Sequence, residues 1–409
     1  MTSLDRRSFL KTTTAGLASL AAARGEARPA NPANSSNDDP LGVRAEFPIT
    51  KTQAYLNTAS SGPFPRAVKE AALAFVEEKT LRPTPGSRQE TRARARAKFA
   101  KLFGAKEEEV AFLYSTSDGE NLVARGLDLQ AGDNVVIDEL HFITSFVLFR
   151  QLEKEKGIEL RVVPQRKGRS EIEDFEARID RRTRLVSVAW VSNRNGYRHN
   201  IRALADLAHA HDALLYADAI QAFGTFPMRL RQEGVDFATG NSYKWIYAGY
   251  GVAPFFIREE HLDRIRSDRY GHVQVAESLP DYQYRLQKTA QKFEYANPAY
   301  GPLYQLDAAL SFLEEVGLGR IEAHGVALAA ELRQGVNKLG FEVWTPSNNA
   351  SPIVTFPHRQ KPEDMARLLD KEAVVVTLPE GGTHIRAAMG MFNNQSDINR
   401  LLKVLERIT

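Results

Sequence analysis

The stretch GNSYKWIYAGYGVAP, residues 240–254, places Lys244 between two aromatic residues and ahead of a glycine-rich segment. An apolar run, residues 254–257, ends the stretch and extends beyond it. Aromatic neighbours and removal from water lower the pKa of a lysine, and a neutral amine can attack a carbonyl to form a Schiff base. The surroundings of Lys244 are therefore typical of a reactive lysine rather than a solubilising one.

The composition around this stretch is that of a soluble globular enzyme. The chain has 409 residues, of which 43% are hydrophobic and 26% charged. This length allows a large core and two structural lobes. No window approaches the roughly 20 consecutive apolar residues that a membrane-spanning helix requires. We therefore expect no stable membrane insertion.

The first residues carry the features of an export signal. DRRSFLK, residues 5–11, is followed by the mildly apolar TTTAGLASLAAA, and the order resembles a twin-arginine signal with a cleavage site near residues 21–23. Asp5 stands where a Ser or Thr is usual, and a disordered basic tail is the alternative. We predict a signal peptide at residues 1–28, a linker at 29–44, and a periplasmic protein that the twin-arginine machinery exports.

Charge and cysteine content exclude several classes of function. Five basic and two acidic residues within residues 1–28 account for the formal net charge of +3, so the rest of the chain is near neutral. A nucleic-acid partner therefore has no electrostatic basis. The absence of cysteine excludes disulfides, thiolate metal sites and a thiol nucleophile. His209 and His211 are spaced i,i+2, which does not place both on one helical face, so no metal site is expected.

The pattern of the middle of the chain predicts an α/β fold with a mainly parallel sheet, because short apolar runs alternate with amphipathic stretches. Strands are predicted at residues 110–114, 134–137, 159–163, 185–190, 213–217 and 237–239. Helices are predicted between them at residues 120–127, 145–154 and 201–211.

The pattern changes near residue 303 and indicates a smaller α+β lobe. Helices are predicted at 303–316, 321–338 and 397–408, and strands at 341–344 and 353–356. We assign residues 63–302 to the large domain, and residues 45–62 together with 303–409 to the small one. ETRARARAKFAKLFG, residues 90–104, is predicted to form an amphipathic helix whose basic face is solvated.

Three polar motifs follow predicted strands and supply partners for Lys244. AWVSNRNG reaches Asn193, LLYADAIQAFG reaches Asp218, and FLYSTSDGENLVARG reaches the small residues that follow Ser115. In open α/β sheets, ligands bind at the carboxyl ends of strands, and helix N-termini hold phosphate. An amine, a carboxylate and a phosphate cup together indicate pyridoxal 5'-phosphate chemistry.

The chain resembles class V aminotransferase-fold enzymes, the fold-type I pyridoxal-phosphate family that includes cysteine desulfurases, kynureninases and isopenicillin N epimerase-like proteins. The resemblance runs from YLNTASSGP, residues 55–63, to GGTHIRAAMGMFNNQSDINRLLKVL, residues 381–405. It implies that Lys244 holds the cofactor as a Schiff base and that Asp218 pairs with the pyridine nitrogen. Further implied cofactor contacts are His141 stacked on the ring, Asn193 and Gln221 at the phenolic oxygen, and Thr116, Ser117, Asn241 and Tyr243 at the phosphate.

The resemblance also implies how substrate and partner subunit are bound. Arg386 in HIRAAMG would take the substrate α-carboxylate, with Asn57 as a second substrate contact. Many relatives carry Gly-Thr that reaches across a homodimer to the phosphate, whereas this chain has Ala296 and Asn297, so Asn297 is the candidate for that contact. The homodimer itself is an expectation from the resemblance.

The function expected from these features is a pyridoxal-phosphate enzyme that acts at the amino-bearing carbon of an amino acid or of an amino-acid residue in a larger metabolite. Transaminase-like chemistry is favoured, because desulfurases pass sulfur to a cysteine and this chain has none. Among exported members the chain is similar to periplasmic enzymes that modify the glutamyl group of pyoverdine siderophores. C–S lyase, kynureninase-like and epimerase-like activities remain alternatives, as does a cofactor-binding protein without catalysis.

Overall fold

A computed structural model describes residues 38–83 and 86–409, and the predicted signal peptide lies outside this range. The main element is a seven-stranded sheet in the order β2-β8-β7-β6-β5-β3-β4. Its strands are β2 (Val110–Leu113), β3 (Asn134–Asp138), β4 (Glu159–Val163), β5 (Thr183–Ala189), β6 (Leu214–Asp218), β7 (Phe237–Thr239) and β8 (Ala253–Ile257).

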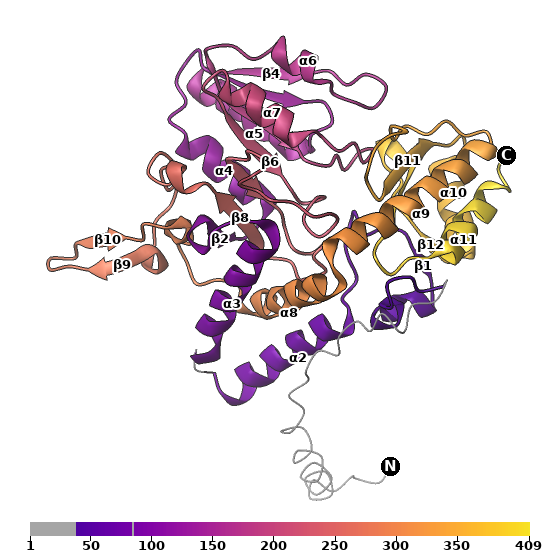
Figure 1. Ribbon diagram of the computed structural model, residues 1–409, viewed down its shortest axis with the longest axis horizontal. Helices are drawn as coiled ribbons and strands as arrows, with labels where there is room; N and C mark the ends of the chain where they lie inside the picture. Colours follow the sequence, from indigo (N-terminus) through magenta and orange to yellow (C-terminus); the bar gives the residue numbers. More distant parts are fainter. Residues whose placement is uncertain (1–37, 84–85) are drawn as a thin grey trace, which may run out of the picture.

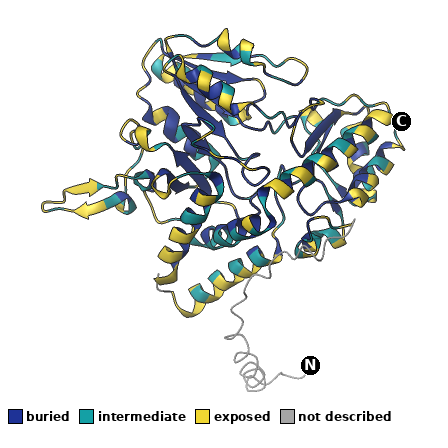
Figure 2. Ribbon diagram, in the orientation of Figure 1, coloured by how far each residue is buried: buried dark blue, intermediate teal, exposed yellow. Residues whose placement is uncertain are grey.

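The strand directions confirm the predicted α/β class. Strands β4, β3, β5, β6 and β7 pair in parallel, while β8 runs antiparallel to its two neighbours β7 and β2. Figures 1 and 2 show helices around a sheet whose strands are almost entirely buried. Burial on both faces explains why these strands read as continuous apolar runs. The connecting helices are α4 (Thr116–Gly126), α5 (Ile143–Lys156), α6 (Ile172–Glu176) and α7 (Ile201–His209).

The C-terminal part of the chain forms a second group of elements with its own core. Early residues Ala54 and Leu56 share this core with the last helix of the chain. The strand that contains Ala54 pairs in parallel with β12, and β11 pairs antiparallel with β13. The elements are β1 (Ala54–Tyr55), α9 (Leu318–Lys338), β11 (Ile353–Pro357), α10 (Pro362–Lys371), β12 (Val374–Val375), β13 (His384–Ala388) and α11 (Gln395–Leu405).

The remaining helices lie beside the sheet, and one hairpin projects from the body. Helices α2 and α3 both pack against α8, which leads into the C-terminal group (Figure 1). The hairpin formed by β9 and β10 extends away from the other elements. The bounds are α2 (Arg66–Leu81), α3 (Gly86–Phe103), β9 (Val275–Ser278), β10 (Tyr284–Leu286) and α8 (Tyr300–Val316).

Two local expectations are wrong. Residues 341–344 do not form a strand; instead, the backbone N–H groups of Trp344 and Thr345 both donate to the Thr355 carbonyl, at 2.9 and 3.3 Å. The Thr345 hydroxyl donates to the Asn195 carbonyl at 2.7 Å, which ties this segment to a turn of the large sheet rather than to a ladder. The solvated basic face expected for α3 is wrong for Arg92 and Arg96, which are buried, whereas Arg94 and Lys101 are exposed as expected.

Within the described ranges, no helix combines the length and apolar character needed to cross a bilayer.

Candidate active site

The candidate active site is a cavity at the carboxyl ends of β5 and β6, beside the first turn of α4. Residues that the sequence predicts as cofactor contacts come together there from segments far apart in the chain. This is the position at which open α/β sheets bind ligands. The lining residues are Ser115, Thr116, Ser117, Glu120, Phe142, Thr144, Ser145, Ala189, Val191, Asn193, Asp218, Ile220, Gln221, Asn241, Tyr243 and Lys244.

Lys244 lies on a tight turn that a glycine from another segment supports. The Gly62 N–H donates to the Tyr243 carbonyl at 2.8 Å, and a Cβ atom at position 62 would lie 2.0 Å from the Lys244 carbonyl oxygen. The Ser242 hydroxyl lies within hydrogen-bond distance of two carbonyls across the glycine-rich segment, at 2.9 and 3.0 Å. These contacts fix the backbone from which the Lys244 side chain enters the cavity.

The environment of Lys244 favours its neutral form. The residue is only 9% exposed, and its Nζ lies 5.8 Å from the centre of the Tyr243 ring. Burial lowers the pKa of Lys244 to about 8, against the opposing effect of Asp218, while the positive charge of Arg386 lowers it further. A lysine with this pKa is a competent nucleophile near neutral pH.

Asp218 provides the carboxylate at the end of β6. One of its oxygens accepts a hydrogen bond from the Ile220 N–H at 3.0 Å. Burial raises the pKa of Asp218, and the backbone donor and the charge of Lys244 oppose this rise. A cationic group bound here would pair with the Asp218 carboxylate and favour its ionised form. The family resemblance implies that this group is the protonated pyridine nitrogen of the cofactor.

The first turn of α4 contains residues that the sequence predicts as phosphate contacts. The Ser115 side chain caps the helix by accepting from the Asp118 N–H at 3.1 Å, and Thr116 Oγ1 accepts from the Asn241 N–H at 2.9 Å. The turn therefore brings Thr116, Ser117 and Asn241 together at the positive end of an α-helix. The Tyr243 ring stacks on Tyr250, with ring centres 4.1 Å apart, and lines the same cavity.

Two asparagines of the cavity have unsatisfied oxygens. Asn193 Oδ1 and Asn241 Oδ1 are buried without a hydrogen-bond partner among the described residues. Such atoms are expensive to bury unless a ligand pairs with them. The lysine, the carboxylate and the helix N-terminus fit a phosphorylated aromatic aldehyde such as pyridoxal phosphate, whereas the two amide oxygens are acceptors and need a donor group of a ligand.

Gln221 lies on the cavity but is largely engaged elsewhere. Its Nε2 donates to the Ala59 carbonyl at 2.9 Å, and its Oε1 accepts from Trp245 Nε1 at 2.6 Å. One N–H of the amide is left for the contact predicted with the phenolic oxygen.

The predicted stacking role of His141 needs correction. The imidazole is buried and does not line the cavity, because it turns towards the hydroxyl of Ser187, with an Nε2–Oγ distance of 3.0 Å. The aromatic residue that does line the cavity is the next one, Phe142. Burial lowers the pKa of His141 to about 4, so the imidazole is neutral. In the sequence, the one indication that Phe142 could face the cofactor is that it directly follows His141.

Arg386 lies close to the cavity, on β13, in a buried network of neutral acceptors. Its guanidinium donates to the Asn193 carbonyl at 2.6 Å, to Ser60 Oγ at 2.7 Å and to Thr377 Oγ1 at 3.0 Å. The Thr377 hydroxyl in turn donates to Asn57 Oδ1 at 2.6 Å. The structure thus groups both predicted substrate contacts, although neither lines the cavity itself.

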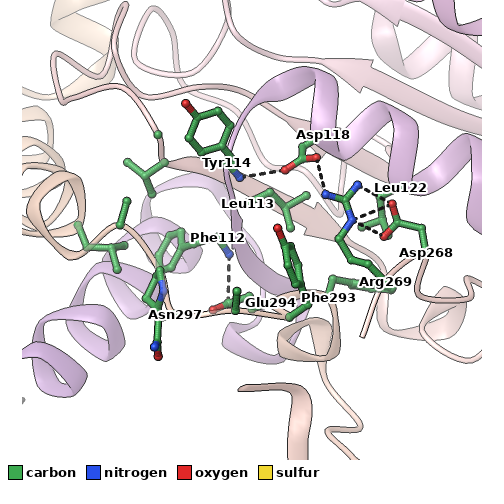
Figure 3. Close-up of a pocket in the computed structure, with 17 residues that line it drawn as sticks. Phe112, Leu113, Tyr114, Asp118, Leu122, Asp268, Arg269, Phe293, Glu294 and Asn297 are labelled. Atoms are coloured by element: carbon green, nitrogen blue, oxygen red, sulfur yellow. Dashed lines mark hydrogen bonds and ion pairs between the residues drawn. The ribbon is translucent and has the colours of Figure 1, made fainter. Parts of the chain in front are cut away.

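Asn297 lies apart from Lys244, in the second cavity that Figure 3 shows. Tyr114 lines this cavity, and its neighbour in the chain, Ser115, lines the first. The predicted contact of Asn297 with a partner subunit stays a prediction.

Glu120 is a cavity residue that the sequence reasoning missed. Glu120 lies four residues after Thr116 on α4, which places the two side chains on the same face of the helix. This spacing was the signal in the sequence that could have identified Glu120. Clusters of three or more His, Cys, Asp or Glu suited to a metal ion do not occur in the described ranges.

Comparison with known proteins places this chain in a family of pyridoxal-phosphate enzymes. The family model described as Aminotransferase class-V matches residues 54–401. A probable cysteine desulfurase of Methanothermobacter thermautotrophicus is 28% identical over 90% of this chain and 97% of its own length. The apo structure of a cysteine desulfurase from Thermococcus onnurineus has a TM-score of 0.83 at 25% identity, over 91% of this chain and 98% of that one.

A second similar structure carries the cofactor. It is a C-DES mutant with glycine covalently linked to pyridoxal phosphate, and it matches with a TM-score of 0.83 over 90% of this chain and 99% of that one. At 19% identity the likeness shows the fold alone.

Proposed function

Because this chain belongs to the class V aminotransferase family and is a pyridoxal-phosphate enzyme, we propose that it acts at the amino-bearing carbon of a substrate with a free carboxylate. An amino acid, or an amino-acid residue of a larger metabolite, has this chemistry. Transfer of the amino group is the favoured reaction.

The observation that carries this proposal is the uncompensated charge of Arg386. The guanidinium is 5% exposed, its three acceptors are neutral, and its Nε is without a partner in the described part of the chain. Burial alone lowers its pKa, to about 10, so no described carboxylate offsets its charge. Because a buried cation is costly unless it is paired, an anionic group of the substrate would complete the site.

The side chains around Lys244 support proton transfer at the amino-bearing carbon. When bound, the cofactor supplies an electron sink for a carbon that loses a proton. The Lys244 amine, with its lowered pKa, can accept that proton in its neutral form. Asp218 would hold the pyridine nitrogen in its protonated state, and Arg386 would orient the carbon by its carboxylate.

C–S bond cleavage is the second candidate function. The similar proteins named above include cysteine desulfurases, and C-DES is itself named as a cystine C–S lyase whose product is cysteine persulfide. Transfer of sulfur to a cysteine of this chain is excluded because the sequence has none. A lyase that releases its product directly needs no such thiol, so cystine and cysteine belong in any substrate screen.

The finer parts of the proposal concern substrate and setting. We propose a periplasmic enzyme that modifies the glutamyl group of a siderophore precursor of the pyoverdine type, supported by the Arg6-Arg7 motif and by the resemblance to exported members. Homodimerisation, with Asn297 near the phosphate of the partner's site, is part of the same proposal. A cofactor-binding protein without catalysis is disfavoured by the intact Lys244, Asp218 and Arg386.

The test is a screen of purified holoenzyme with amino acids, cystine and siderophore precursors, followed by comparison of Arg386 variants. Arg386→Ala should weaken binding of substrates with a free α-carboxylate by about 2–5 kcal/mol, the scale for removing one partner of a buried charge pair. Arg386→Lys keeps the positive charge but loses the two parallel N–H donors of the guanidinium. Its affinity for these substrates should therefore lie between that of the wild type and that of Arg386→Ala. Arg333→Ala is the control, because Arg333 lies outside the site and, within the described residues, donates to the Pro346 and Ser347 carbonyls.

Two outcomes would overturn the ranking of functions. Release of sulfide, persulfide or alanine from cystine or cysteine faster than any amino transfer would favour the lyase. An absorption spectrum of the bound cofactor that no amino donor changes would favour a protein without catalysis.

A further inference from the structure

A second carboxylate lies on the same cavity as Asp218. Glu120, on the first turns of α4, is 4% exposed and lines the cavity together with Lys244 and Asp218. It is close enough to Asp218 for the negative charge of Asp218 to raise its pKa. An acidic side chain in such a place is costly and calls for a functional explanation.

The hydrogen bonds around Glu120 are arranged for an ionised carboxylate. Ser145 Oγ donates to Glu120 Oε2 and Ser187 Oγ donates to Glu120 Oε1, both at 2.7 Å. The Phe142 N–H donates to His141 Nδ1 at 2.8 Å, so His141 carries its proton on Nε2 and points it at Ser187 Oγ. Each carboxylate oxygen therefore has its own hydroxyl donor, and one donor is oriented by a histidine.

This network does not supply a positive charge. The nearest candidate, His141 Nε2, lies 3.5 Å from Glu120 Oε1, but burial keeps the imidazole neutral, with a pKa of about 4. Burial raises the pKa of Glu120 to about 7, against the two serine donors. Titratable groups that face this region are His141, Tyr216, Asp218 and Lys244, with Asp138 and His199 behind His141.

We propose that Glu120 is a positioning residue of the cofactor site: a second carboxylate that acts with Asp218 to stabilise positive charge on the bound cofactor and its lysine linkage. The Ser145 and Ser187 hydroxyls favour its ionised form against the effect of burial, and the bound cofactor would add positive charge to that of Lys244 on the same cavity. Electrostatic stabilisation of this kind is strong in a site from which water is excluded. The inference depends on the cofactor alone, and it stands whether the substrate is an amino donor or cystine.

The test is a spectroscopic pH titration of the Lys244–cofactor linkage in the holoenzyme. Glu120→Gln keeps the size of the side chain and removes the charge, so the protonated linkage should be lost at a pH lower by roughly one unit. The dissociation constant of pyridoxal phosphate should rise about tenfold, which corresponds to the same loss of charge interaction. Glu120→Asp keeps the charge, so the midpoint of its pH titration should lie close to that of the wild type.

Controls separate this role from a structural one. Glu176→Gln removes an exposed carboxylate on α6 and should leave midpoint and affinity unchanged. An unchanged midpoint in Glu120→Gln together with a lower Tm would overturn the proposal and leave Glu120 a structural residue. If Glu120→Gln does not fold, Ser187→Ala is the second variant, because it removes one hydroxyl donor to the Glu120 carboxylate. Glu120 is then more easily protonated, so the midpoint of the linkage titration should also fall. An unchanged midpoint in that variant would equally overturn the proposal.

Discussion

At the scale of single residues, Lys244 is governed by two opposing effects. Burial favours its neutral amine, whereas the negative charge of Asp218 favours its cation. Burial is the larger effect, so the pKa falls to about 8 from an ordinary value of 10.5. The lysine therefore becomes reactive at a pH where a surface lysine is almost fully protonated.

The pH dependence of cofactor capture follows from this. In the apoprotein, the rate at which Lys244 forms its covalent link should rise with pH up to about 8 and level off above it, because only the neutral amine attacks. Stopped-flow absorbance after addition of pyridoxal phosphate measures this rate. Lys244→Ala should give no borohydride-reducible link at any pH, and Lys292→Ala, which alters a lysine outside the cavity, is the control. A reducible link in Lys244→Ala would mean that another lysine anchors the cofactor.

How far single residues could be predicted depended on what surrounded them in the sequence. Lys244, Asp218 and Thr116 follow strands or open a helix, and all three line one cavity as the sequence indicated. His141 and Phe142 are adjacent, so sequence alone could not decide which side chain faces the ligand and which the core. Glu120 was missed because a glutamate inside a helical pattern is usually a surface residue, and its burial depends on β5 and α5 contacts.

At the scale of elements, α3 shows how tertiary contacts override a local pattern. Arg92 and Arg96 both pair with the buried carboxylate of Glu294, which also accepts from the Phe112 N–H at 3.1 Å. Figure 3 shows Glu294 in contact with the strand that contains Phe112. The alternating basic pattern predicted a solvated face because its partner lies about 200 positions away. A distant acid of this kind leaves no local signal.

The importance of this ion cluster can be measured by removing its centre. Glu294→Ala leaves two buried guanidiniums uncompensated, and we expect the free energy of unfolding to fall by about 3–5 kcal/mol. Urea denaturation at fixed cofactor concentration gives this value. Glu314→Ala removes the partner of Lys101 at the exposed end of the same helix and should cost less than about 1 kcal/mol. Equal losses in the two variants would show that α3 is not held by the buried pair.

Some element boundaries agree with the prediction. The strand expected at residues 237–239 has these bounds and is buried throughout, and the edge strand β4 has the expected bounds 159–163 although Glu159 is exposed. Helix α4 begins earlier than expected, at Thr116, because the Ser115 cap sets its start. The segment at residues 341–344 reads as a strand but is tied to Asn195 and Thr355, contacts that no local pattern encodes.

At the scale of the whole molecule, the proposed setting requires the protein to cross a membrane already folded. A phosphorylated cofactor is expected to be inserted in the cytoplasm, and the twin-arginine pathway carries folded proteins. Arg6→Lys combined with Arg7→Lys should trap the precursor in the cell, as measured by immunoblots of periplasmic and cytoplasmic fractions. Arg24→Lys combined with Arg28→Lys, which alters arginines of the same segment outside the motif, should export normally. Undiminished periplasmic protein in the first variant would rule out this route.

The chain positions of the site residues have a consequence for protein synthesis. The residues of the cavity that would receive the cofactor lie between positions 115 and 244, whereas Arg386 is on β13, near the end of the chain. During translation the ribosome therefore releases Lys244 and the residues predicted to bind the phosphate well before it releases Arg386. The support for Lys244 also includes Gly62, which is made earlier still. A nascent chain could thus meet the cofactor before Arg386, the proposed contact for the substrate carboxylate, has been synthesised.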